Sequence, residues 1–274
     1  MAYTKIIFNS LKESLANIWK NKFLFAALFI LQIIFFVVFT ALTYVYIPKI
    51  IESSKAISDY LSKQKFDDAS TAQSILEKKS ILGDDPLLIS RNFKEIIKNF
   101  RLYLIYVFIL LVISTSISWS MTFKIINKKN AIMKIFSKIF IIAFFYFTLI
   151  FLFFFSLTNI SIIDATTQAS MLFVKIIVFL IFSTALLYFM FISLASINHT
   201  ELNNIVQKTL IIGVRKVHYI LALYFINLSF FALSAVSLIY FLEKNLFFLF
   251  LSMILVVFSF VFGRAFMINV TKHL

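Results

Sequence analysis

Six long runs of apolar residues alternate with shorter polar segments along the 274-residue chain. Each run has roughly the 20 residues that a helix needs to cross the hydrocarbon core of a bilayer. None shows the alternation of apolar and polar positions that is typical of a transmembrane β-strand. Because backbone N–H and C=O groups must be paired inside lipid, each run is predicted to be a helix. The runs cover about residues 23–47, 102–126, 139–158, 172–195, 219–241 and 246–268.

A second pattern precedes the first, third and fifth runs. There, apolar residues fall at helical spacing and basic residues gather where the span begins. A basic amphipathic helix next to a span is expected to lie in the plane of the membrane interface, as an elbow. The chain is therefore predicted to be a single membrane domain, an all-α bundle of six transmembrane helices in three elbow-span-span repeats. The repeats cover residues 1–126, 127–197 and 198–274.

The segment after the first span is longer than the other connections and covers about residues 49–101. Apolar residues at helical spacing predict helices in it, and the order Gly83-Asp84-Asp85-Pro86 is typical of one helix ending and another starting. We expect a small helical extracytoplasmic cap that continues into the second span. Pro48 is predicted to kink or end the first span.

Composition and charge exclude an ordinary soluble domain. Hydrophobic residues make up 62% of the chain and charged residues only 14%, whereas a soluble domain has about a quarter of its residues charged. The net charge of +14 would suggest nucleic acid for a soluble protein, but here its placement predicts orientation instead. The loop between the second and third spans has five lysines and no acid. The positive-inside rule therefore predicts a multi-pass protein of the cell membrane with both termini in the cytoplasm.

Polar residues inside the spans form one candidate interior stripe. Ser114, Ser118 and Thr122 are four residues apart and share one face of the second span. Gln32 and Asn227 lie mid-span in the first and fifth spans. Small hydroxyl residues and amides usually let helices pack closely and hydrogen-bond to each other. The alternative is that they form the polar wall of a path for a substrate.

Ionisable groups are nearly absent from the spans, which contain no Asp or Glu. Proton-coupled carriers and ion pumps generally need such a group, so the absence argues against them. Lys175 and Arg264 lie near span ends and are predicted to reach the lipid headgroups. The chain has no cysteine, its three histidines have no carboxylate at a ligand spacing, and no catalytic motif occurs. We therefore expect no enzyme, no cofactor and no metal site.

Basic residues beside the elbows are candidate contacts for anionic lipid on the cytoplasmic face, because each gains roughly 1 kcal/mol near acidic headgroups. The alternative is that they only enforce the topology. The candidates are Lys20, Lys22, Lys128, Lys129, Lys134, Lys138, Arg215 and Lys216.

The repeated layout, in which Ser10-Leu11-Lys12-Glu13 leads to Ile18-Trp19-Lys20-Asn21-Lys22-Phe23, resembles the membrane domain attached to some glycerophosphodiester phosphodiesterases and its stand-alone relatives. The phosphodiesterase domain itself is missing, so the resemblance implies no catalytic residue. The layout also resembles the six-span permeases of ABC-2-type exporters. That resemblance implies that Asn127–Ser137 would touch a separate ATPase, although the loop at Glu243–Asn245 is too short for the outer hairpin of those permeases.

The sequence thus predicts an integral membrane protein that works as a scaffold, assembly or lipid-organising factor without enzymatic activity. The alternative is the permease subunit of an ABC-2-type exporter. The expected partners are anionic lipids and another membrane protein or the separate ATPase, and no nucleic acid.

Overall fold

The computed structural model describes residues 2–63, 86–127, 132–158, 169–197 and 202–274. These residues form helices and short turns with no strand among them, which confirms the all-α fold. Six of the helices are long and apolar enough to cross a membrane, so the chain is an integral membrane protein. They are α2 (Lys22–Lys63), α4 (Pro86–Ile126), α5 (Ile132–Thr158), α7 (Ala169–Ser196), α9 (Val217–Phe241) and α10 (Leu246–Lys272).

The chain divides into two compact units, and the smaller one covers residues 35–110. It contains the later part of α2 and the earlier part of α4. The ring of Tyr46 lies 6.3 Å from that of Tyr103 and 5.9 Å from that of Tyr106. Pro48 lies inside α2, which continues for 15 further residues to Lys63, so this proline does not end the helix.

The predicted cap falls largely within this smaller unit. The part of it between residues 64 and 85 lies outside the described residues. From Pro86, where the described residues resume, α4 runs without a break through the second span. The helix start predicted at Pro86 stays a prediction, because the residues before it lie outside the described ones.

The larger unit covers residues 1–34 and 111–274. It begins with α1 (Ala2–Lys20), which the turn at Asn21 separates from α2. The amide of Asn21 donates hydrogen bonds to the backbone oxygen of Asn17 at 3.0 Å and to that of Ile125 at 2.7 Å. These bonds hold the corner between α1 and α2 against the end of α4.

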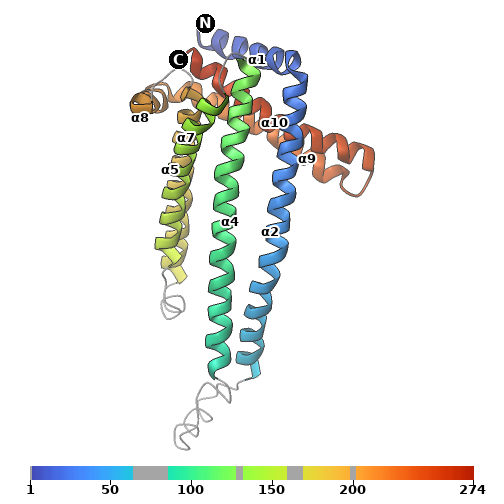
Figure 1. The fold of residues 1–274 in the computed structure, drawn as a ribbon, viewed down its shortest axis with the longest axis vertical. Helices are drawn as coiled ribbons and strands as arrows, with labels where there is room; N and C mark the ends of the chain where they lie inside the picture. The colour runs from blue at the N-terminus through green and yellow to red at the C-terminus, as the bar shows by residue number, and fades with distance from the viewer. Residues whose placement is uncertain (1, 64–85, 128–131, 159–168, 198–201) are drawn as a thin grey trace, which may run out of the picture. The chain divides into compact units, whose positions relative to one another are not determined.

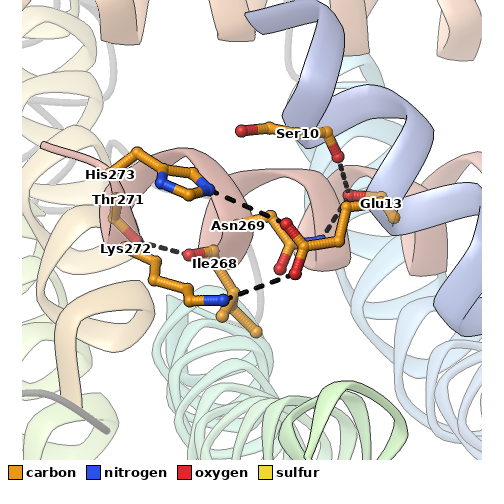
Figure 2. Close-up of polar contacts among 8 residues, drawn as sticks. Ser10, Glu13, Ile268, Asn269, Thr271, Lys272 and His273 are labelled. Atoms are coloured by element: carbon orange, nitrogen blue, oxygen red, sulfur yellow. Dashed lines mark hydrogen bonds and ion pairs between the residues drawn. The ribbon is translucent and has the colours of Figure 1, made fainter. Parts of the chain in front are cut away.

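A polar seam joins α1 to the C-terminal end of α10 (Figure 2). The Asn269 amide donates to Ser14 Oγ at 2.8 Å, and Ser14 Oγ donates to the Ser10 backbone oxygen at 2.6 Å. All three residues are fully buried. At the edge of the seam, Glu13 forms ion pairs with Lys272 at 3.4 Å and His273 at 3.7 Å.

The predicted second elbow is wrong over its described part. Residues 128–131 lie outside the described residues, and from Ile132 onward the chain already belongs to α5, which runs unbroken to Thr158. A turn residue separates each of the other two predicted elbows from its span: Asn21 follows α1, and Lys216 lies between the π-helix that follows α8 (Leu202–Leu210) and α9. The start of α5 has no Gly, Pro or Asn, so nothing in it interrupts a helix.

The last two spans, α9 and α10, form an antiparallel pair joined by a short turn (Figure 1). The Asn245 side chain caps α10 by accepting hydrogen bonds from the backbone N–H groups of Phe247 at 2.9 Å and Phe248 at 3.4 Å. The last third of α10 is almost wholly buried, from Val261 to Thr271. It packs against α1, α7 and α9 and forms the centre of the unit.

Candidate functional site

A cavity of about 460 Å³ lies inside the larger unit, within the size range of small-molecule sites. The start of α2, the end of α4, and parts of α7, α9 and α10 line it. Its walls combine aromatic and aliphatic side chains with a few hydroxyl, amide and guanidinium groups. The polar members of the lining are Gln32, Ser114, Thr115, Ser118, Tyr224, Asn227, Ser259 and Arg264.

Among the described residues, Arg264 is the charged residue that lines this cavity, and no Asp or Glu does. Its Nη2 donates to Gln32 Oε1 at 3.5 Å, which is long compared with the usual 2.9–3.0 Å. Its Nε is buried without a hydrogen-bond partner. Within the part of the chain that the structure describes, no carboxylate forms an ion pair with this guanidinium. The described residues therefore leave the cation without a countercharge.

Asn227 lies beside Arg264 in the lining because α10 has a glycine at position 263. A Cβ added to Gly263 would come within 3.3 Å of Asn227 Cγ, closer than most real contacts. The missing side chain lets Asn227 Nδ2 approach the Gly263 backbone oxygen to 3.4 Å. Asn227 Oδ1 is buried without a partner. The cavity thus has an unpaired acceptor as well as an uncompensated cation.

The predicted stripe on α4 divides between this cavity and the core. Ser114 and Ser118 line the cavity, whereas Thr122 is fully buried away from it. Ser114 Oγ donates to the Leu111 backbone oxygen at 3.2 Å, and Thr122 Oγ1 donates to that of Ser118 at 2.7 Å. These bonds stay within α4, so they satisfy the hydroxyl donors locally instead of joining two helices.

The lining differs between its exposed and its inner members. The exposed ones are all apolar: Leu228, Phe231 and Phe260 are 64%, 36% and 39% exposed. Every polar member is buried or half-buried, and Ser118 and the neighbouring Trp119 are each only 2% exposed. The cavity therefore has an apolar rim on α9 and α10 and a polar interior.

One wall of the cavity is connected to the π-helix η2 (Ile211–Arg215) that follows α8. Tyr224 donates through its hydroxyl to the Tyr188 backbone oxygen at 3.4 Å, and the Tyr188 hydroxyl donates to the Gly213 oxygen at 2.7 Å. Phe189 packs so closely here that a Cβ on Gly213 would lie 2.9 Å from its ring. These contacts fix the turn between α8 and α9.

The predicted lipid-contact residues do not line the cavity. Lys20, Lys22, Lys134, Arg215 and Lys216 are exposed, Lys138 is half-buried, and Lys128 and Lys129 lie outside the described residues. Lys22 Nζ lies 4.3 Å from the centre of the Trp19 ring, within cation–π range. Their contact with anionic lipid stays a prediction.

Sequence reasoning missed Arg264 as a site residue and placed it at the headgroups. The structure corrects this, because the side chain turns toward Gln32 and the cavity. A signal was present: Arg264 lies four positions inside the predicted end of the sixth span at residue 268, which corresponds to about 6 Å along a helix axis. An ionisable residue within a span indicates a functional site.

No family model, no curated protein and no solved structure matches the chain. Among the described residues, no group of three or more His, Asp or Glu side chains could hold a metal ion. The two resemblances of the layout stay predictions, and the cavity has to be understood from its own chemistry.

Proposed function

We propose that the protein is a lipid-organising membrane protein that holds one amphipathic lipid molecule in this cavity and catalyses no reaction on it. The observation that carries the proposal is the contrast between the apolar exposed rim and the polar interior. An amphipathic molecule has the same two parts in the same order, a polar head and an apolar tail.

The rim also indicates where the ligand comes from. Leu228, Phe231 and Phe260 belong to α9 and α10, two of the helices long enough to cross a membrane. In a bilayer, exposed side chains of such helices face the acyl chains of lipids. A water-soluble substrate would have to cross this apolar rim, whereas a lipid can slide in sideways from the hydrocarbon.

The lining chemistry supports binding over catalysis. In the described part of the chain, the lining contains serine, threonine and tyrosine hydroxyls but no His, Cys, Asp or Glu. A hydroxyl nucleophile needs a neighbouring base to activate it, and none of the lining groups can act as one near neutral pH. The amides and hydroxyls can instead donate to and accept from a headgroup.

α1 supports a place for the protein at the membrane surface. It buries Ser10, Ser14 and Ile18 against the rest of the unit and leaves Phe8 and Trp19 67% and 73% exposed. Exposed aromatic side chains beside basic residues are typical of helices seated among headgroups. In the proposal, α1 and its lysines lie at the cytoplasmic headgroups, close to the cavity-forming helices.

The permease alternative has little support from the geometry. The short turn between α9 and α10 leaves no room for an outer hairpin. The described part of the predicted ATPase contact, residues 132–137, belongs to α5 and forms no separate helix. An ATPase that co-purifies in mild detergent would nevertheless favour it over our proposal.

Native mass spectrometry of the full chain, purified in mild detergent, tests the proposal. We expect one retained lipid per protein molecule. Gly263→Leu, which fills the cavity beside Asn227, should abolish retention. Leu255→Phe is the matched control, because it adds volume at an exposed position of the same helix that does not line the cavity. Equal retention by both variants, or lipid hydrolysis by the purified protein, would overturn the proposal.

The orientation can be tested separately. Cysteines introduced at Ser70 and Lys128 should react with a membrane-impermeant maleimide from opposite sides of the membrane. Reaction from the same side would show that the predicted topology is wrong.

A further inference from the structure

We infer that the lipid in the cavity carries a negatively charged oxyanion, a carboxylate or a phosphate, and that Arg264 binds it. This inference rests on the function proposed above and goes further by naming the chemical class of the ligand.

The first step is the charge of the cavity. Arg264 is its charged lining residue, and its contact with Gln32 at 3.5 Å is a neutral and long hydrogen bond. A buried or half-buried charge is costly unless an opposite charge pairs with it. No predicted span supplies a carboxylate, since none of the six apolar runs contains Asp or Glu. Among the described residues no countercharge faces the guanidinium, so a bound anion would supply one.

The second step is the chemistry of the guanidinium. Arginine presents several N–H donors in a planar fork that matches the two oxygens of a carboxylate or phosphate. The Gln32 contact uses one nitrogen, Nη2, and its length makes it easy to exchange for a stronger, charge-assisted bond. A neutral alcohol would satisfy a donor but leave the charge, and a cationic headgroup would add repulsion.

The third step is the direction of the ligand. Arg264 and Asn227 belong to the inner, half-buried part of the lining, while the exposed rim is formed by Leu228, Phe231 and Phe260. An oxyanion at Arg264 therefore places the tail across the rim. A free inorganic anion has no tail to occupy this rim, so a fatty acid or a lysophospholipid fits better than inorganic phosphate.

Fluorescence titration of the full chain in a neutral detergent tests the inference. Trp119 lines the cavity, and Trp19→Phe removes the only other tryptophan. The probes are oleate, oleyl alcohol, lysophosphatidate and inorganic phosphate. We expect oleate and lysophosphatidate to bind at least about tenfold tighter than oleyl alcohol, because a charged hydrogen-bonded pair replaces a neutral contact. Inorganic phosphate should show no saturable binding.

Three variants locate the effect. Arg264→Gln should weaken oleate binding at least about tenfold, to the level of oleyl alcohol, and leave the alcohol's affinity unchanged. Arg264→Lys should keep a smaller preference for oleate, because the charge stays but the fork is lost. Lys175→Gln is the matched control, since Lys175 is an exposed cation of α7 that does not line the cavity. It should bind all probes like the parent protein.

The outcomes separate this inference from the proposed function. Equal affinity for oleate and oleyl alcohol, unchanged in Arg264→Gln, would overturn the inference and leave lipid binding standing. Absence of binding by every amphiphile would overturn both. Inorganic phosphate binding as tightly as lysophosphatidate would keep the anion site but overturn its lipid ligand. If Arg264→Gln misfolds and therefore loses alcohol binding, Arg264→Lys tests the inference in its place. A reduced preference of that variant for oleate over oleyl alcohol would support the inference, and an unchanged preference would contradict it.

Discussion

Two polar places lie five residues apart on α10 and differ in charge and in the space around them, although each has buried atoms without a hydrogen-bond partner, Asn269 Oδ1 at one and Arg264 Nε at the other. At the seam with α1, Asn269 is fully buried and donates to Ser14 Oγ at 2.8 Å (Figure 2). At the cavity, Arg264 is half-buried and has only the 3.5 Å contact with Gln32. The seam has protein groups packed around it, whereas the cavity keeps about 460 Å³ of space beside the guanidinium.

The difference separates a structural role from a binding role. A polar side chain that is buried against protein partners fixes the arrangement of helices, because breaking it leaves those partners unsatisfied. A charged side chain that has space beside it and no countercharge can instead form an ion pair with a bound ligand. Removing the Asn269 side chain should therefore lower the stability of the fold, and removing the Arg264 charge should change ligand binding.

Asn269→Ala should have the largest effect on stability. It removes the hydrogen bond to Ser14 and leaves a small void in the most buried part of α10. We expect a loss of about 1–3 kcal/mol in the free energy of unfolding. Thermal unfolding in detergent would measure it, and the preference of the surviving folded protein for oleate should stay unchanged. A loss of that preference without a loss of stability would show that Asn269 acts in ligand binding and not in holding the helices together.

Gly213→Ala and Gly263→Ala compare a packed glycine with a cavity glycine. A Cβ at Gly213 would lie 2.9 Å from the Phe189 ring, so we expect overpacking and a loss of about 1 kcal/mol or more. At Gly263 the nearest atom is Asn227 Cγ, 3.3 Å away, and the amide can shift into the cavity. Thermal unfolding should therefore show the larger loss for Gly213→Ala. The reverse order would show that the space beside Asn227 is not available.

Arg264→Gln should leave the stability of the ligand-free protein unchanged or slightly higher, within about 1 kcal/mol. An unpaired charge inside a span is unfavourable, so its removal costs little when no ligand is bound. The measurement is the melting temperature with and without oleate. Oleate should raise the melting temperature of the parent protein and have much less effect on the variant. A large loss of stability without ligand would assign Arg264 a structural role.

Glu13→Gln should have the smallest effect. Its ion pairs with Lys272 and His273 join side chains that are between 36% and 45% exposed, where solvent and salt screen the attraction. Such pairs are typically worth about 0.2–1 kcal/mol. We expect a small drop in melting temperature at low salt that disappears at high salt. A drop that salt does not reduce would indicate that the seam depends on this carboxylate.

Much of the fold could be predicted from the sequence, because each span is a local property of about 20 consecutive residues. The predicted fifth span, 219–241, agrees closely with α9 at Val217–Phe241. The predicted second elbow is wrong over its described part, because no turn residue interrupts the start of α5. At Pro48 a kink or an end was predicted, and α2 does not end there. Both continuations lie beside the predicted spans, where each further helical residue adds a backbone hydrogen bond to a helix that is already formed.

The candidate site could be predicted only in part. Gln32, Ser114, Ser118 and Asn227 were recognisable as polar residues in apolar runs, and the structure brings all four to one cavity. Arg264 was misplaced because its distance from the span end gives no information about the side to which it points.

The sequence by itself therefore determined that this is an integral membrane protein of six apolar helices, since the hydropathy and the length of each helix depend only on consecutive residues. Only the tertiary structure decided which polar groups meet. Gln32 and Arg264 are 232 residues apart in the chain, and helix packing alone brings them to the same cavity. Because that packing provides space beside the guanidinium, and no carboxylate among the residues that the structure describes, Arg264 becomes part of a candidate binding site.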